Sequence, residues 1–111
     1  MQFIATSHFR NLNDTGQNIS NGICNILKFV VVNTTAATAF VQIFNAAAAN
    51  VVLGTTVPMF VIVVPITTGV VDMEFDSPGL YITTRCSAFS TTTAEGSTGS
   101  ASGVFLQAAI N

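Results

Sequence analysis

Three carboxylates at alternate positions are the side chains best placed to do chemistry in this sequence. Asp72, Glu74 and Asp76 follow one another at i, i+2 and i+4, a spacing that puts all three on one face of a β-strand. Oxygen ligands in such a row suit a hard cation such as Ca²⁺. A solvated strand face gives the same pattern, and we favour that interpretation. The sequence therefore predicts no metal site and no cofactor.

The remaining reactive side chains form no recognisable catalytic set. His8 is the only histidine and has no Cys, Asp or Glu beside it in the sequence, so a triad would have to be assembled by the fold. Cys24 and Cys86 are expected on different strands, where one disulfide is arithmetically possible, but we favour buried free thiols. The glycines of residues 96–103 lack the spacing and the lysine of a phosphate-binding loop. We therefore expect a protein that is not an enzyme.

Charge is unusually scarce. Three basic and five acidic residues make up 7% of 111 residues, half of the chain is apolar, and the mean hydropathy is +0.61. This composition excludes disorder of the whole chain, and three cations are too few to bind nucleic acid through a basic surface. The longest strongly apolar run, residues 57–66, contains two prolines and is too short for a membrane-spanning helix. The N-terminus has no basic start and no long apolar run, so we expect no secretory signal.

Valine and threonine dominate the chain, and both favour β-strands. Strands are expected at residues 22–32, 38–45, 57–64, 70–75, 80–89 and 104–110, with a further short strand at residues 3–6. Their spacing, with no helix between them, predicts an all-β fold: an antiparallel, jelly-roll-like β-sandwich of six to eight strands. Residues 1–21 are expected to form an N-terminal arm and loop, and residues 22–111 the sandwich domain.

Some of the expected strands are apolar on both faces, although a two-layer sandwich buries only one face of each sheet. In residues 57–64 and 38–45 both alternating sets of side chains are apolar, with Gln42 the exception. The second apolar face needs a cover, for which we favour a neighbouring subunit over a loop or arm of the same chain. The residues expected in this interface with a neighbouring subunit or another partner are Phe3, Phe9, Val30, Val32, Val41, Ile43, Phe60, Ile62 and Val64.

The order of turns and strands between residues 32 and 89 resembles that of small structural proteins of tailed bacteriophages. The motifs are Asn33-Thr34-Thr35 after a strand, an aromatic strand over residues 39–45, Gly54-Thr55-Thr56-Val57-Pro58, a stop at Val64-Pro65, and Gly79-Leu80 before another strand. These motifs are mostly turn chemistry, and they cover about half to two-thirds of the chain. Residues 1–31 do not align with the pattern.

The resemblance implies a viral protein of the virion, and we favour a capsid decoration (cement) protein. Such a protein would be made in the host cytoplasm and displayed on the capsid exterior. It would form a homotrimer that binds and stabilises the shell of the major capsid protein, with no nucleic acid or membrane partner. A tail, baseplate or fibre component is the alternative. A second alternative is a secreted β-sandwich module that binds glycans or cations through Asp72, Glu74 and Asp76.

Overall fold

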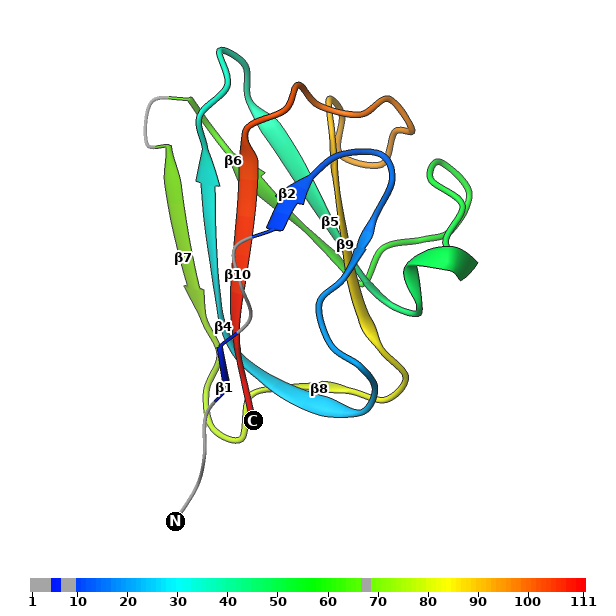
Figure 1. Ribbon diagram of the computed structural model, residues 1–111, viewed down its shortest axis with the longest axis vertical. Helices are drawn as coiled ribbons and strands as arrows, with labels where there is room; N and C mark the ends of the chain where they lie inside the picture. Colours follow the sequence, from blue (N-terminus) through cyan, green and yellow to red (C-terminus); the bar gives the residue numbers. More distant parts are fainter. Residues whose placement is uncertain (1–4, 7–9, 67–68) are drawn as a thin grey trace.

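The computed structural model describes residues 5–6, 10–66 and 69–111, which form two antiparallel β-sheets packed against each other (Figure 1). The predicted all-β sandwich is therefore confirmed. The described chain contains more strands than the six to eight expected, because several are only two or three residues long. Each sheet has one face toward the other sheet, and the hydrophobic core lies between them.

The larger sheet has six strands, with β4 at its centre. β10 and β7 flank β4, while β1 and β2 both pair with the other edge of β10, and β8 pairs with the first residues of β4. The bounds of these strands are Ala5–Thr6 (β1), Arg10–Leu12 (β2), Cys24–Asn33 (β4), Val70–Glu74 (β7), Leu80–Ile82 (β8) and Val104–Ile110 (β10).

The smaller sheet has four strands in the order β3-β9-β5-β6, so β6 is an edge strand. A 3₁₀ turn, η1, lies in the connection from β5 to β6 and begins within the run of alanines at residues 46–49. The bounds are Gln17–Asn18 (β3), Ala39–Asn45 (β5), Ala48–Asn50 (η1), Phe60–Val64 (β6) and Cys86–Thr91 (β9).

The strand expected over residues 80–89 is divided between the two sheets. β8 pairs with β4 in the larger sheet, whereas β9 pairs with β5 in the smaller one, and the chain crosses between them over residues 83–85. Asn45 fixes this crossing: its Nδ2 donates to Thr83 Oγ1 at 2.7 Å, and its Oδ1 accepts from the Thr84 N–H at 3.0 Å. The crossing consists of Thr83, Thr84 and Arg85, with no glycine or proline to indicate the change of sheet.

The segment expected as an arm and loop contributes to both sheets. β2 pairs with β10, β3 pairs with β9, and the side chains of Leu12 and Ile19 are buried in the core. The described residues from Arg10 onward are thus packed on the sandwich. Phe3, His8 and Phe9 lie outside the described residues.

The turn between β7 and β8 follows the chemistry expected for Asp76-Ser77-Pro78-Gly79. The Gly79 N–H donates to the Asp76 carbonyl at 2.6 Å, and Gly79 has a φ of 102°. A Cβ atom at this position would lie 2.7 Å from the Ile26 carbonyl oxygen, so only glycine fits there. This turn directs β8 onto the start of β4.

Candidate interaction surfaces

Four of the residues expected on an external interface are buried in the core. Val41, Ile43 and Val64 are fully buried and Ile62 is 2% exposed, and all four belong to the cluster between the sheets. The prediction for β5 and β6 was therefore wrong, because the residues expected on the outward face point into the core. The register explains the arrangement, because Val41 lies opposite Ile62 and Ala39 opposite Val64, so these rows point inward together. These four side chains are not available to a partner of the folded chain.

The outward face of β5 is covered largely by the chain itself. Phe44 is 1% exposed and meets Phe89 edge to face, with ring centroids 5.4 Å apart. Gln42 is fully buried, and its Nε2 donates to Thr91 Oγ1 at 2.8 Å and to the Gly96 carbonyl at 3.0 Å. The hairpin after β9 thus closes over the centre of the smaller sheet. This part of the second apolar face has an intrachain cover.

A shallow hollow of about 360 Å³ remains beside this cover. Phe89, the loop over residues 14–16 and the segment around η1 line it. Gly16 lies so close to Phe89 that a Cβ atom there would overlap the ring. Because Phe89 is only 4% exposed, its ring offers little surface for stacking against a ligand.

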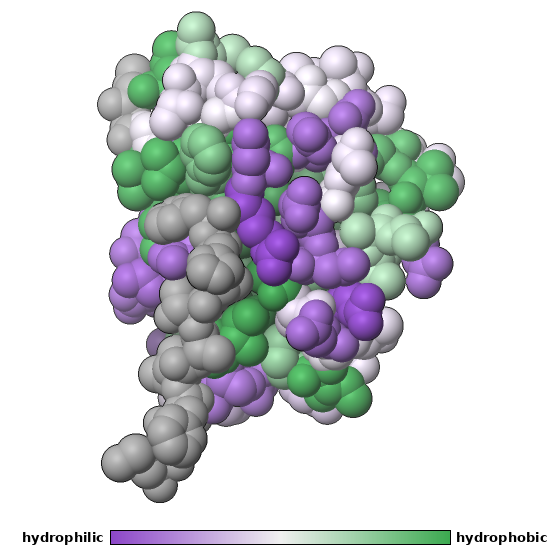
Figure 2. Space-filling model, in the orientation of Figure 1, coloured by the Kyte–Doolittle hydropathy of each residue, from purple (hydrophilic) through white to green (hydrophobic). Residues whose placement is uncertain are grey.

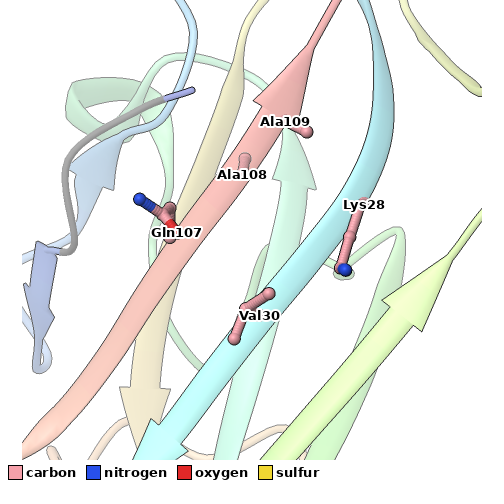
Figure 3. Close-up of a pocket in the computed structure, with 5 residues that line it drawn as sticks. All are labelled: Lys28, Val30, Gln107, Ala108 and Ala109. Atoms are coloured by element: carbon pink, nitrogen blue, oxygen red, sulfur yellow. The ribbon is translucent and has the colours of Figure 1, made fainter. Parts of the chain in front are cut away.

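Val30 and Val32 do face outward, on the larger sheet. Both are partly buried, and the register aligns Val32 with Val70 and Phe105, and Val30 with Asp72 and Gln107. A second hollow of about 210 Å³ lies here between β4 and β10, and Figure 3 shows the side chains that line it. Its walls are Lys28, Val30, Gln107, Ala108 and Ala109, a set with one charge.

Hydrophilic and hydrophobic residues form separate groups on one face of the molecule. Figure 2 shows hydrophilic residues gathered down the middle of the face that carries β2 and β10, with separate hydrophobic groups nearer the margins. The strand register gives Val30 polar neighbours and Val32 apolar ones, so these two valines belong to a mixed surface.

The acidic row on β7 is partly neutralised by a lysine on the neighbouring strand. Lys28 Nζ lies 3.1 Å from Asp72 Oδ2 and 3.7 Å from Glu74 Oε1, and both carboxylates are exposed. The hydrogen bond to Asp72 and its charge, with smaller contributions from Glu74, raise the pKa of Lys28. Asp76 lies beyond the end of β7, at the turn. No group of three or more metal-ligating side chains occurs among the described residues.

The two cysteines are free thiols on opposite sheets. Cys24 begins β4 and is half-buried, whereas Cys86 begins β9 and is fully buried. Burial raises the pKa of the Cys86 thiol to about 12, and the charge of Cys24 contributes further. Cys86 is therefore protonated at neutral pH, which suits a packing role and not that of a nucleophile.

Phe60 closes the core at the side of the sandwich where β6 and β7 lie. It is half-buried, and its ring centroid lies 6.1 Å from that of Phe29 and 6.0 Å from that of Phe75. Phe29 and Phe75 are themselves in edge contact at 6.0 Å. Three rings, from β6, β4 and the end of β7, thus hold the two sheets together here.

The exposed apolar side chains concentrate around β6 and its flanks. Eight large hydrophobic residues of the described chain are exposed, and five of them fall between residues 57 and 70. The sequence pattern predicted a contact surface on this strand, but it assigned that surface to Phe60, Ile62 and Val64, which alternate with the exposed residues. Those exposed here are Val57, Met59, Val63, Ile66 and Val70.

Comparisons with protein families, with curated proteins and with solved structures give no match for this chain. In its described part, no helix has the length and apolar character needed to cross a membrane.

Proposed function

We propose that this chain is a non-enzymatic structural protein of a tailed-bacteriophage virion. In this proposal it is a capsid decoration (cement) protein, made in the host cytoplasm, that binds the major capsid protein on the outside of the shell as a homo-oligomer. The resemblance of the turn motifs between residues 32 and 89 to small phage virion proteins supports the assignment. The same resemblance implies a trimer.

The observation that carries the proposal is the uncharged, apolar surface around β6. Val57 is 78% exposed, and Val63 and Ile66 are about half exposed, on a chain in which residues 29–71 contain no charged side chain. Exposed apolar patches of this kind mark contact sites, because burying them against a partner removes apolar area from water. A decoration protein meets both sibling subunits and the shell, and so has two such partners.

Counting copies of the chain in purified virions tests the proposal. Quantitative mass spectrometry against the major capsid protein should give hundreds of copies per particle, and density for the sandwich should appear on the capsid exterior. A few to dozens of copies would assign the chain to the tail, baseplate or fibre instead. Absence from the purified particle would refute a virion role.

Stabilisation of the shell is the second measurable consequence. Particles that lack the chain should release their genome at a lower temperature, and adding the purified protein should restore the wild-type temperature. Restoration follows because a ligand that binds only the intact shell stabilises it by mass action. Equal release temperatures with and without the bound protein would contradict a cement function.

A further inference from the structure

Two strand edges are exposed on the same side of the sandwich, and they differ in charge. β6 ends the smaller sheet and β7 ends one side of the larger sheet, and the rings of Phe60, Phe29 and Phe75 join the two sheets between them. β7 carries Asp72 and Glu74. β6 carries no charge and lies inside an uncharged run of 43 residues, 29–71.

The backbone groups that β6 presents at its edge can be identified from one hydrogen bond. The Met59 N–H donates to the Ile43 carbonyl at 2.7 Å, so the polar groups of Ile43 face β6. Backbone polar groups alternate in direction along a strand, and in this register Phe60, Ile62 and Val64 therefore bond to β5. The N–H and C=O groups of Val61 and Val63 point away from β5, toward the edge. Within the described residues, β6 pairs with β5 alone.

Two of the three residues that present the corresponding groups on β7 have acidic side chains. The Asn33 N–H donates to the Gly69 carbonyl at 2.6 Å, and the Phe75 N–H donates to the Leu27 carbonyl at 3.0 Å. By the same alternation, Val70, Asp72 and Glu74 present their N–H and C=O groups at the edge of the larger sheet. Charged side chains at an edge hinder pairing with a further strand. β7 has this protection and β6 lacks it.

We propose that the edge of β6 pairs antiparallel with β6 of a second copy of this chain, which joins the two smaller sheets into one continuous sheet. The proposal rests on the self-association in the proposed function, and it identifies the surface that self-association uses. It also changes the expected symmetry, because a contact between two identical strands is twofold, whereas a trimer needs a head-to-tail contact.

The residues of β6 are complementary to themselves in this arrangement. Centring the pair on Ile62 places Val61 opposite Val63 of the second copy, and Phe60 opposite Val64. Val61 and Val63 carry the groups that point to the edge, so each Val61–Val63 pair exchanges both of its backbone hydrogen bonds. Every cross-strand neighbour is apolar, and no like charges oppose one another. A partner strand with charged side chains would meet no opposite charge on β6.

Matched substitutions on the two edges test the contact. Val63 and Val70 are 51% and 52% exposed, both are valines on edge strands, and both present an N–H to the edge. Val63→Pro removes a donor that faces solvent in the monomer, a position where an edge strand tolerates proline. Val70→Pro is the control on β7. Val63→Lys and Val70→Lys form a second pair that adds a charge without altering the backbone.

The readout is molar mass from light scattering on the full chain over a micromolar dilution series, against a monomer mass of 11.6 kDa. The wild type and both Val70 variants should have twice the monomer mass, while both Val63 variants should dissociate with a dissociation constant about tenfold higher or more. Circular dichroism and the melting transition of the diluted monomers show whether each variant is folded. Amide exchange at Val61 and Val63 should be slow in the wild type and fast in Val63→Lys.

Three results would overturn the β6 contact. One is a wild type that stays monomeric throughout the dilution series, and another is an oligomer whose mass the Val63 substitutions leave unchanged. The third is a trimer that depends on Val70 as much as on Val63. The proposed virion function fails on a different measurement, the absence of the chain from purified particles, so the two failures are distinguishable.

Discussion

We expect Asn33→Ala to destabilise the protein more than the alanine substitution of any other polar residue. Asn33 ends β4 and is 6% exposed, and its side chain joins the two sheets. Its Nδ2 donates to the Val64 carbonyl and to the Ala37 carbonyl, both at 2.9 Å. Its Oδ1 accepts from the N–H of Thr35 at 2.9 Å and from the Thr35 hydroxyl at 2.7 Å.

The size of this destabilisation depends on which of the hydrogen-bond partners is shielded from water once the Asn33 side chain is removed. The bond to Val64 is buried, so its loss costs the bond and leaves a carbonyl without this donor, while the groups on Ala37 and Thr35 are part-buried and can turn toward solvent. The Val64 carbonyl keeps its ladder bond to β5, so the loss is that of the four hydrogen bonds themselves, at about 0.5–1 kcal/mol each, or about 2–4 kcal/mol for Asn33→Ala. The melting temperature should fall by about 8–16 °C.

Asn45→Ala is the matched control, measured by urea unfolding beside Asn33→Ala. Asn45 also makes two side-chain hydrogen bonds, to Thr83 and Thr84, but both are exposed, so its loss should cost about 1 kcal/mol or less. Equal destabilisation by the two substitutions would refute the reasoning, because it would mean that burial of the Asn33 bonds contributes nothing. An unchanged dependence of the unfolding free energy on urea concentration would show that both variants unfold from the same compact state.

Three further perturbations test other parts of the structure. The stability of the wild type should fall as the pH rises from about 9 to about 12, by up to about 4 kcal/mol, because the Cys86 thiol ionises near 9 when unfolded but keeps its proton to about 12 when folded. Cys86→Ala should remove most of this slope, leaving a smaller one from Lys28, and an unchanged slope would contradict its assignment to Cys86. Lys28→Met should leave the urea midpoint unchanged at high salt, since its ion pairs are exposed; a large loss independent of salt would show that they are structural. Gly16→Ala should cost about 1–3 kcal/mol in thermal unfolding because its methyl group would overlap the Phe89 ring, whereas Gly22→Ala, with open space around it, should cost little.

The positions of the main strands could be predicted because their boundaries carry local chemistry. Pro58 and Pro65 flank β6, and Gly79 ends the turn before β8, so turn residues mark where pairing stops. On β7 the alternation of Val71 and Met73 with the acidic residues also gave the correct inward face, since these two pack against the core. Where one face is polar and the other apolar, the period of two is enough to orient a strand.

The inward face of β5 and β6 could not be predicted in the same way. When both alternating sets are apolar, alternation carries no information about which set faces the core. Gln42 was the only polar residue in the pattern, and it is buried on the outward face of its sheet, beneath the hairpin that supplies Thr91 and Gly96. Contacts between segments some 50 residues apart determine which set faces the core, and a local sequence pattern does not contain them.

The same contacts narrow the place where a partner can bind. Scarce charge and two-faced strands suggested that a whole sheet face was left for another subunit to cover, but Phe44, Phe89 and Gln42 show that the chain covers much of the smaller sheet itself. Most of the large apolar side chains still exposed to water lie around an edge strand, and an edge offers backbone hydrogen bonds as well as apolar area. Partners that stack on a face would add a third layer and depend on side chains alone. A partner that extends the sheet must form hydrogen bonds with the backbone groups of Val61 and Val63. A proline at residue 63 therefore weakens sheet extension but not stacking on a face. A change of apolar side chain would weaken both modes of association.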